Sequence, residues 1–387
     1  MTSAYNPINI YNLTVLKAAK NWCKHGFIEK DQLGAIRQTY AVPLYHPNSL
    51  IRILLFVATL FALSGATGFF TLIVADSGRI FISLACIVYG LASFYAVEKF
   101  FIAKNHYKSG VTEAIIYHGC GFVIGGLGGI SDFNTHILLW SCLVVFSFAA
   151  FRYLDLVCTV CAIGSLAGIL FFEFYSLDGI FKQIIPFVFM LGFAPVYFIS
   201  KKLSQRVDLK LWRNNLLILE VVSLLLIYVG GNYLVVRELS VELTGLAIEE
   251  DADIPFAFIF YTTTVLFPVI YLFFGIKNKD IVLLRVSLIL IAFSAFTFKY
   301  YFSLGHPEIT LTAAGIILIV TAISVMHYLK KMRNGFTREN LLTERWGNMN
   351  AEAFLISQTM GGNQTSLNKS DLPGGGQFGG GGSTNDF

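Results

Sequence analysis

Charged side chains are scarce in this sequence. Asp, Glu, Lys and Arg make up 13% of its 387 residues, against roughly 25% in soluble domains, while 55% of the residues are hydrophobic and 36 are Phe. So few charges cannot cover a large soluble surface, and the remaining apolar surface would aggregate in water but is matched to lipid. The scarcity of charge therefore excludes a soluble globular protein and favours one embedded in a membrane.

Cysteines are few, and their positions do not suit a disulfide framework. Most lie within apolar runs and none lies in a long polar loop, unlike the cysteines of small secreted domains. The six are Cys23, Cys86, Cys120, Cys142, Cys158 and Cys161. The polar N-terminal segment also lacks the apolar stretch and cleavage site of a secretory signal peptide, so we expect the first span to remain as a signal anchor.

Recognisable catalytic and nucleotide-binding motifs are also missing. There is no His-Glu-x-x-His motif, no Ser-His-Asp grouping and no dense acid–His cluster in the apolar runs, so we expect no enzyme and no cofactor. The Gly-rich stretch 119–129 has neither a preceding strand nor a Lys-Ser/Thr ending, which excludes a phosphate-binding loop. The net charge of +4 is modest and lies in short loops, so it indicates membrane orientation and no nucleic-acid partner.

What the sequence does contain is a series of apolar runs of spanning length. Each is close to the ~20 residues that a helix needs to cross a ~30 Å hydrocarbon core. The sequence therefore predicts an all-α polytopic membrane helical bundle of about ten transmembrane helices. The predicted spans are Ile51–Ala75, Ile80–Val97, Thr112–Gly129, Thr135–Phe151, Leu154–Phe174, Ile180–Ser200, Leu211–Val235, Phe256–Ile276, Ile281–Tyr301 and Ile309–Leu329.

The loops between these runs alternate in charge. One set, here called the basic loops, is rich in Lys and Arg, whereas the other set is nearly free of them. Because Lys and Arg are retained on the cytoplasmic side, the alternation predicts both termini inside, and an even number of spans satisfies every loop. The basic loops are Lys99–Lys108, Arg152–Asp155, Lys201–Arg213 and Lys277–Lys279, and the N-terminal segment and the tail Lys330–Arg338 share their character. The opposite loops are Asp76–Arg79, Ser131–Asn134, Ser176–Gly179, Arg237–Asp253 and Ser303–Glu308.

Residues 1–48 read as a small cytoplasmic domain. Apolar residues recur at helical spacing over Asn9–Gly26, and a second short helix is predicted over Glu29–Tyr40. Pro43 and Pro47 then break the chain before the membrane. The pattern predicts an amphipathic helical hairpin.

The transmembrane domain is predicted at 49–330. A cytoplasmic juxtamembrane segment is expected at 331–360, and a disordered Gly-rich tail at 361–387. The composition implies the lipid bilayer as one partner, and the two cytoplasmic ends offer surfaces for protein partners.

Ionisable residues within a membrane span are costly, so each is a candidate site. Glu220, in the cytoplasmic half of the seventh span, is a candidate proton or cation site, or alternatively forms an interhelical hydrogen bond or ion pair. Glu173 and Lys299 lie at similar depth near the outer ends of their spans, which allows them to pair. Each could instead extend alone to the interface, and we favour this second interpretation.

Four further residues have side chains that bind soft metal ions. His118 and Cys120 lie in the third span, and Cys158 and Cys161 begin the fifth, at similar predicted depth. We treat them as weak metal candidates only, because a Cys-x-x-Cys pair in an apolar helix usually consists of two small packing residues.

The third span repeats glycine every fourth residue at Gly121, Gly125 and Gly129, which predicts close helix packing. Prolines inside predicted spans could kink those helices or break them, as at the substrate sites of transporters. They are Pro186, Pro195 and Pro268.

The N-terminal hairpin carries a resemblance. It contains Trp22, then Gly26-Phe27-Ile28, then Asp31-Gln32-Leu33, and leads into many spans. This resembles bacterial predicted multi-pass inner-membrane proteins of unknown function that begin with such a helical pair. The Gly-rich run 374–382 is similar to the ends of some bacterial membrane-anchored proteins. The resemblance implies a bacterial cytoplasmic (inner) membrane location but no activity.

Two classes of function follow from these observations. The span count, the proline-containing spans and Glu220 favour a transporter of a small solute or ion. The alternative is a non-catalytic scaffold or sensor in an envelope complex, acting through its cytoplasmic ends. A membrane enzyme acting on lipid-linked substrates would be a third class, but it lacks a motif.

Overall fold

The computed structural model is almost entirely helical, and it describes residues 3–24, 26–177, 180–244 and 253–301 together with a few helical residues between 315 and 327. The chain divides into two compact units, one containing residues 12–42 and the other containing residues 43–339 with the first eleven. Within the described ranges the only β-type pairing is a single bridge between Tyr45 and His106.

The N-terminal helices are α1 (Pro7–Lys24) and α2 (Lys30–Thr39). Gly26 ends the first of them at φ +77°, a left-handed conformation that favours glycine. Glu29 starts the second with a capping box that involves Gln32. The hairpin has a core of its own, formed by Ala19, Trp22, Ile36 and Tyr40.

Nine helices in the described part of the chain are long and apolar enough to cross a membrane. They are α3 (Ser49–Val74), α4 (Arg79–Ala96, continued by the π-helical turn Val97–Ile102), α5 (Val111–Ile130), α6 (Thr135–Tyr153), α7 (Leu156–Tyr175), α8 (Ile180–Ser204), α9 (Arg213–Gly231, preceded by the 3-10 turn Val207–Trp212), α11 (Ala257–Lys277) and α12 (Ile281–Tyr301). The protein is therefore an all-α, multi-pass integral membrane protein, as the sequence predicts.

The predicted spans agree with these helices to within a few residues, with one exception. The seventh was predicted to run to Val235, but α9 ends at Gly231, and a separate helix, α10 (Tyr233–Thr244), follows Asn232. The side chain of Asn232 accepts a hydrogen bond from the backbone N–H of Val235, so it caps the new helix. The tenth predicted span, Ile309–Leu329, falls almost wholly outside the described residues, as do the segments 331–360 and 361–387.

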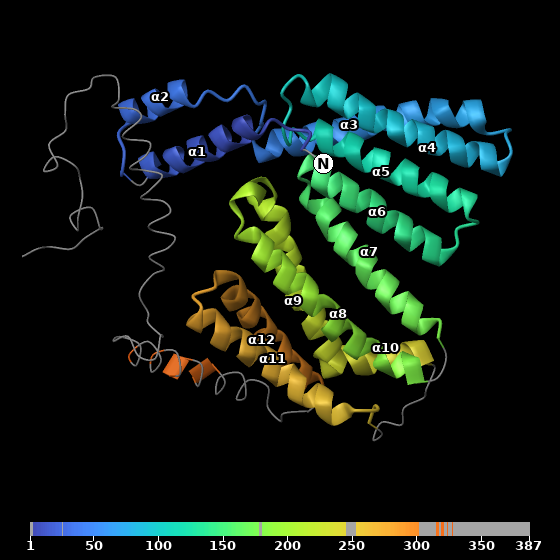
Figure 1. Cartoon of the computed structure of the whole chain (residues 1–387), viewed down its shortest axis with the longest axis vertical. Coiled ribbons are helices and arrows are strands. Elements are labelled where there is room, and N and C mark those ends of the chain that lie inside the picture. The colour runs from blue at the N-terminus through green and yellow to red at the C-terminus, as the bar shows by residue number, and fades with distance from the viewer. Residues whose placement is uncertain are drawn as a thin grey trace, which may run out of the picture. The chain divides into compact units, whose positions relative to one another are not determined.

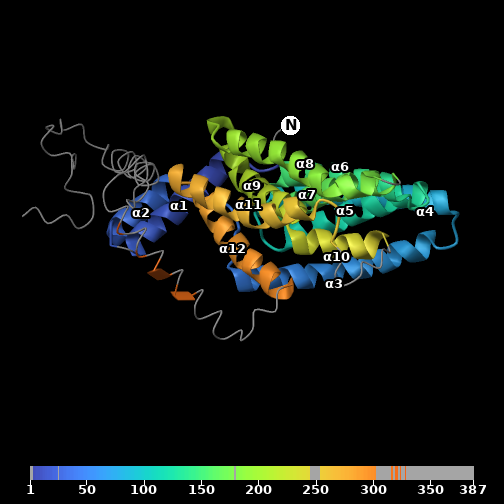
Figure 2. The same cartoon turned by 90° about the horizontal axis from the view of Figure 1, so that it is seen from below.

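Neighbouring spans pack as antiparallel pairs: α4 with α5, α6 with α7, α8 with α9, and α11 with α12. Figure 1 shows α4 to α7 side by side in chain order, and Figure 2 shows α3 running along the same group. Helices α8 and α11 continue through their prolines, so neither is broken at Pro186, Pro195 or Pro268.

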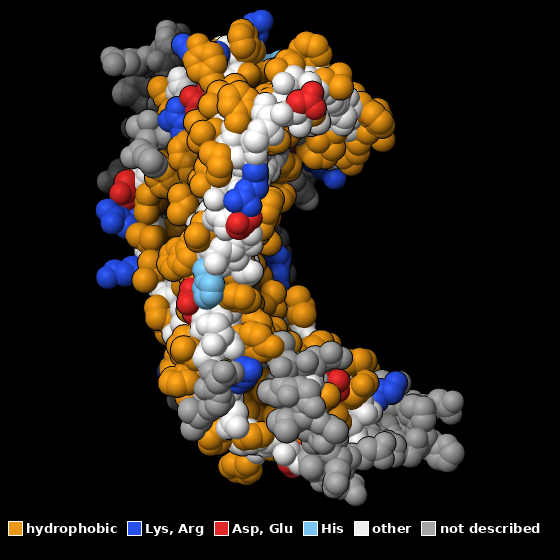
Figure 3. All heavy atoms as spheres, turned by 90° about the vertical axis from the view of Figure 1, so that its right-hand side faces the viewer, with side chains coloured by type: hydrophobic (Ala, Val, Ile, Leu, Met, Phe, Trp, Pro, Cys, Tyr) orange, Lys and Arg blue, Asp and Glu red, His pale blue; other side chains and the backbone are white. Residues whose placement is uncertain are grey.

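Apolar side chains cover much of the face of the described residues that Figure 3 shows. On α3, for example, Phe61 is 74% exposed and Leu72 is 79% exposed. In a lipid bilayer such side chains contact a solvent of their own polarity.

Candidate functional site

The first turn of α5 contains a buried carboxylate with several hydrogen-bond donors. Glu113 is buried, and its Oε1 accepts a hydrogen bond from Arg52 Nη2 of α3 at 2.6 Å. Its Oε2 accepts bonds from the backbone N–H of Gly110 at 2.8 Å and from the Thr112 hydroxyl at 2.9 Å. A buried carboxylate with this many charge-assisted bonds is fixed in place and in turn fixes Arg52.

Gly110 allows the two helices to approach this closely. It has φ +91°, and a Cβ at this position would collide with the backbone carbonyl of Arg52. No other residue fits such a position without displacing α3. The junction of α3 and α5 therefore depends on a glycine that hydropathy alone does not reveal.

A cavity of about 330 Å³, here called the Arg52 cavity, opens beside this junction. It is lined by Ser49, Arg52, Ile53, Phe56, Gly110, Glu113 and Tyr117. The side chain of Arg52 is 41% exposed, whereas that of Glu113 is 5% exposed. The guanidinium group of Arg52 is therefore more accessible from the cavity than the carboxylate of Glu113.

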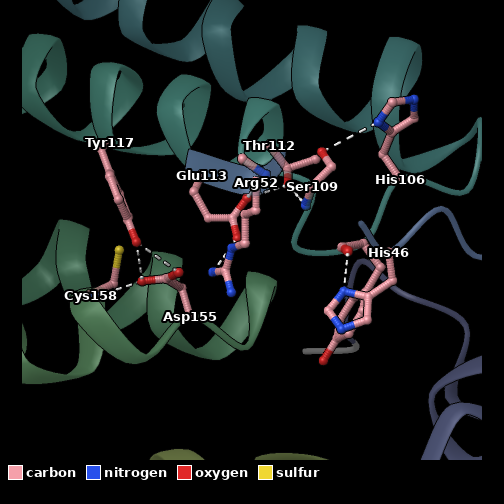
Figure 4. Close-up of polar contacts among 11 residues, drawn as sticks. His46, Arg52, His106, Ser109, Thr112, Glu113, Tyr117, Asp155 and Cys158 are labelled. Carbon is pink, nitrogen blue, oxygen red and sulfur yellow. Dashed lines mark hydrogen bonds and ion pairs between the residues drawn. The ribbon is translucent and has the colours of Figure 1, made fainter. Parts of the chain in front are cut away.

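A second buried carboxylate lies next to the first (Figure 4). Asp155 starts α7: its Oδ1 accepts the backbone N–H of Cys158 at 2.8 Å, and both of its oxygens lie within 3.2 Å of the Tyr117 hydroxyl. Asn215 of α9 donates to the Asp155 backbone carbonyl at 3.0 Å and to the Thr159 hydroxyl at 2.7 Å. Tyr117 therefore connects the Arg52 cavity to a polar junction of α5, α7 and α9.

The start of the chain also contacts this region. The backbone N–H of Ala4 donates to the carbonyl of Arg152 at 2.9 Å, and the buried Tyr5 ring packs edge-on against Tyr107. Burial raises the pKa of the Tyr5 phenol well above its usual range, and the charge of nearby Glu113 adds to the effect. Burial likewise raises the pKa of Tyr107. Both phenols are therefore neutral at physiological pH.

Two histidines flank the loop that leads into α5, as Figure 4 shows. A ring nitrogen of His46 lies 3.3 Å from the carbonyl oxygen of Tyr107, and one of His106 lies 3.3 Å from the Ser109 hydroxyl. The contact of His46 links the basic loop Lys99–Lys108 to the segment that precedes α3, and the contact of His106 joins that loop to the residues just before α5.

A larger cavity, of about 590 Å³, lies further along α5 and is here called the His118 cavity. It is lined by Arg79, Ile82, Ser83 and Cys86 of α4, by His118, Gly121, Phe122, Gly125 and Gly129 of α5, and by Phe133. The two ring nitrogens of His118 contact different helices: Nε2 lies 3.0 Å from the Thr67 hydroxyl of α3, and Nδ1 lies 3.3 Å from the Ser93 hydroxyl of α4.

The glycine repeat of α5 serves two purposes. A Cβ on Gly126 would lie 2.5 Å from the Ser83 carbonyl oxygen of α4, and one on Gly129 would collide with the Ser83 hydroxyl. Gly121 and Gly125 have nothing within 4 Å of such an atom. The prediction that the repeat Gly121, Gly125 and Gly129 packs closely is therefore correct for Gly129 and wrong for the other two, which line the His118 cavity.

Glu220, the main sequence candidate, is buried and lines neither of these cavities. Its carboxylate lies within hydrogen-bonding reach of the Ser204 hydroxyl on α8. Nearby, Lys201 bonds to Asp280 at 2.7 Å and to the Tyr197 hydroxyl at 2.9 Å. The Ser204 hydroxyl itself donates to the Lys201 carbonyl at 2.9 Å, and the role of Glu220, as an ion site or in an interhelical hydrogen bond, stays a prediction.

Glu173 and Lys299 do not meet. Glu173 pairs instead with His136 at the start of α6, with Nδ1 and Oε1 2.9 Å apart. Lys299 is exposed on α12 and forms no ion pair with any residue that the structure describes.

The structure brings three of the four soft-ligand candidates, Cys120, Cys158 and Cys161, near one another but leaves His118 apart. Cys120 and Cys158 are both buried and lie within hydrogen-bonding distance of each other, whereas His118 contacts α3 and α4. Cys161 lies near Cys142 of α6. Over the described ranges no group of three or more His, Cys, Asp or Glu side chains could hold a metal ion.

Sequence reasoning missed Arg52, Glu113, Tyr117 and Asp155. Arg52 and Glu113 both lie within the first residues of predicted spans, at the end where the basic loops lie. Opposite charges at the same depth in two spans were the available signal, but charges near span ends also occur as ordinary interfacial flanks.

Comparison with models of protein families finds no match, and comparisons with curated proteins and with solved structures find no similar protein.

Proposed function

We propose that this integral membrane protein transports a small solute or ion along the face of α5 that meets α3 and α4. One observation carries the proposal: the two cavities lie in succession along the same spanning helix. On α5, Glu113 and Tyr117 line the Arg52 cavity, and His118, the residue after Tyr117, is the first that lines the His118 cavity. Sites near the bilayer midplane, accessible in turn from each side, are typical of secondary transporters.

Polar groups continue across the membrane along this face. Glu113 lies in the first turn of α5, His118 lies five residues or about 7.5 Å further along the helix, and Arg79 and Ser83 line the far part of the second cavity. Polar side chains at membrane depth are costly unless they are paired or face a cavity. Their alignment on one side of α5 supports a route for a polar or charged solute.

Alternating access also requires an element that can move, and α3 is the best candidate. No residue in the apolar window of α3 is buried inside the protein, whereas more than half of the residues in the corresponding window of α5 are buried. Fewer packing contacts therefore hold α3 in place than hold α5. The polar contacts of α3 with the rest of the route are Arg52 with Glu113 at one end and Thr67 with His118 further along. Ring contacts of Phe56 with Tyr117 and of Phe70 with Tyr89 and Phe122 add to them. A helix held by a few polar contacts can shift at small cost.

The test is uptake by the purified protein in proteoliposomes. Radiolabelled organic anions, zwitterions and sugars, together with Na⁺, K⁺ and protons followed by dyes, would be offered in turn. For the solute that is taken up, we expect His118→Gln to lower the rate about tenfold or more, the effect of losing ~1.4 kcal/mol of interaction. His136→Gln is the matched control, because His136 lines neither cavity.

Two results would contradict the proposal. One is uptake no faster than in empty liposomes for every solute tried, with the protein shown to be folded and inserted. The other is equal loss of uptake in the two histidine variants. Glu220, Glu173 and Lys299 are alternative ion-binding positions, and their neutral variants belong in the same assay.

The hairpin gives one reason to keep a second function in view, that of a scaffold or sensor. Its helices form a compact unit with a separate core, as expected of a small docking domain. Purification in mild detergent from the native host, with and without residues 1–40, tests this function. A stable partner lost on deletion would support it, and recovery of the same proteins with both forms would contradict it.

A further inference from the structure

We propose that the Arg52 cavity binds an oxyanion, the carboxylate or phosphate group of a small organic solute, with Arg52 as its principal ligand. This inference rests on the proposed function and names the chemical class of the transported solute.

Arg52 is a fixed but incompletely used donor. A guanidinium group carries five N–H donors. Among the described residues, Arg52 uses one side-chain nitrogen, Nη2, in its contact with Glu113, and its side chain is 41% exposed. Because Arg binds carboxylate and phosphate groups through two parallel N–H bonds, its remaining donors suit an oxyanion.

Glu113 orients the arginine without competing for the cavity. Gly110 and Thr112 occupy its second oxygen, and its side chain is only 5% exposed. A solute entering the cavity therefore meets the guanidinium before the carboxylate. A buried acceptor that locks the rotamer of an exposed arginine is the usual way to preorganise such a ligand.

The other carboxylate of the junction also faces elsewhere. Asp155 is not part of the cavity lining, and its oxygens accept bonds from the Tyr117 hydroxyl and from the Cys158 N–H. Asp155 therefore does not present a bare negative charge to the solute. Ser49 adds a hydroxyl donor at the start of α3, where the helix dipole also favours an anion.

The rest of the lining suits a small organic group. Ile53 and Phe56 of α3 and the Tyr117 ring form its apolar side. The volume of about 330 Å³ is near the lower end of the range for small-molecule sites. A cation would gain little here, because both carboxylates are already bonded and the one exposed charge is positive.

The experiment measures binding directly, so that its result does not depend on transport. The full-length protein in phosphatidylcholine nanodiscs would be titrated with inorganic phosphate, glycerol 3-phosphate and succinate, and binding followed by calorimetry. In a second arm, phosphatidylglycerol would replace part of the lipid, because a lipid headgroup offers the same phosphate chemistry. We expect saturable binding of at least one soluble probe and competition from the anionic lipid only if the headgroup enters the cavity.

Variants assign the binding to Arg52. Arg52→Gln should weaken binding about tenfold or more, and Ser49→Ala should weaken it less. Arg52→Lys keeps the charge but loses the planar fork, so it should fall between wild type and Arg52→Gln. Arg206→Gln is the matched control, because Arg206 also pairs with an acidic residue, Asp208, but follows α8 and lines neither cavity.

The inference would be overturned if neither a soluble probe nor phosphatidylglycerol bound saturably, or if Arg52→Gln bound as tightly as wild type and the Arg206→Gln control do. Binding seen only with anionic lipid, and lost in Arg52→Gln, would support the oxyanion site with a lipid as its source. Uptake of a cation or a neutral solute without any anion binding would remove this inference and leave the proposed function intact.

Discussion

Arg152 and Glu98 form a bidentate ion pair at the end of the bundle where the basic loops lie. Nε lies 2.9 Å from Oε1, and Nη2 lies 2.8 Å from Oε2. Glu98 belongs to the π-helical turn that extends α4, and Arg152 lies in the last turn of α6. The Tyr153 hydroxyl also donates to Oε1 of the same carboxylate at 3.2 Å.

We expect Glu98→Gln to destabilise the folded protein by roughly 1–3 kcal/mol, because it removes the negative charge from a partly buried bidentate ion pair. Thermal unfolding in detergent would show this as a lower Tm. Asp208→Asn removes the acidic partner of the more exposed pair with Arg206 and should leave Tm nearly unchanged. Equal Tm values for the two variants would show that the Glu98 pair contributes no more than a surface pair.

Gly126 and Gly121 should respond in opposite ways to the same substitution. A methyl group on Gly126 would lie 2.5 Å from the Ser83 carbonyl oxygen, so Gly126→Ala must push α4 and α5 apart, at a cost of about 1–3 kcal/mol. Gly121→Ala meets open space and gains helix propensity, so it should be neutral or stabilising by up to about 1 kcal/mol. Unfolding in mixed detergent measures both. A similar loss of stability in Gly126→Ala and Gly121→Ala would contradict the close approach of α4 and α5 at Gly126 and the open space at Gly121.

The spans were predictable because hydropathy reports directly on burial in lipid. For α3, α11 and α12, each expected boundary lies within two residues of the observed one. The same signal failed at Asn232, where the run stays apolar but the helix ends. Hydropathy averages over many residues, whereas a single capping side chain with local hydrogen bonds decides where a helix stops.

The candidate site was less predictable, because it depends on which helices are neighbours. Arg52 and Glu113 are separated by 61 residues in sequence, and each alone looks like an interfacial flank. The helical periodicity of the sequence does not predict which helices are neighbours, so it does not predict that α3 packs on α5 or that Gly110 allows their close approach. Glu220 attracted attention because of its depth, but its surroundings could be known only from the positions of Ser204 and Lys201.

Variants of Glu113 and Glu220 distinguish two locations for the transport site, one beside the Arg52 cavity and the other at Glu220. Glu113→Gln loosens the contact that fixes Arg52, so uptake of the transported solute should fall about tenfold. Glu220→Gln keeps a hydrogen-bonding group beside Ser204 and lines neither cavity, so we expect uptake close to that of wild type. Initial rates in proteoliposomes, normalised to inserted protein, decide between them. A loss of uptake in Glu220→Gln but not in Glu113→Gln would indicate that the transport site lies between α8 and α9.

The orientation of the chain can be tested with reporters that are active on only one side of the membrane. Because the basic loop Lys99–Lys108 follows α4 and the opposite loop Asp76–Arg79 precedes it, fusions after Lys104 and after Ser77 should give opposite signals, with the Lys104 fusion cytoplasmic.

A fusion at the C-terminus tests the span count at the same time. The nine helices that the structure describes are an odd number and would leave the ends of the chain on opposite faces. The additional span predicted over Ile309–Leu329 returns the C-terminus to the cytoplasmic side, where its neighbouring tail Lys330–Arg338 carries the positive charge expected there. We therefore expect the C-terminal fusion to match the Lys104 fusion. A match to the Ser77 fusion would show that 309–329 does not cross the membrane, and the charge of the tail would then need another explanation.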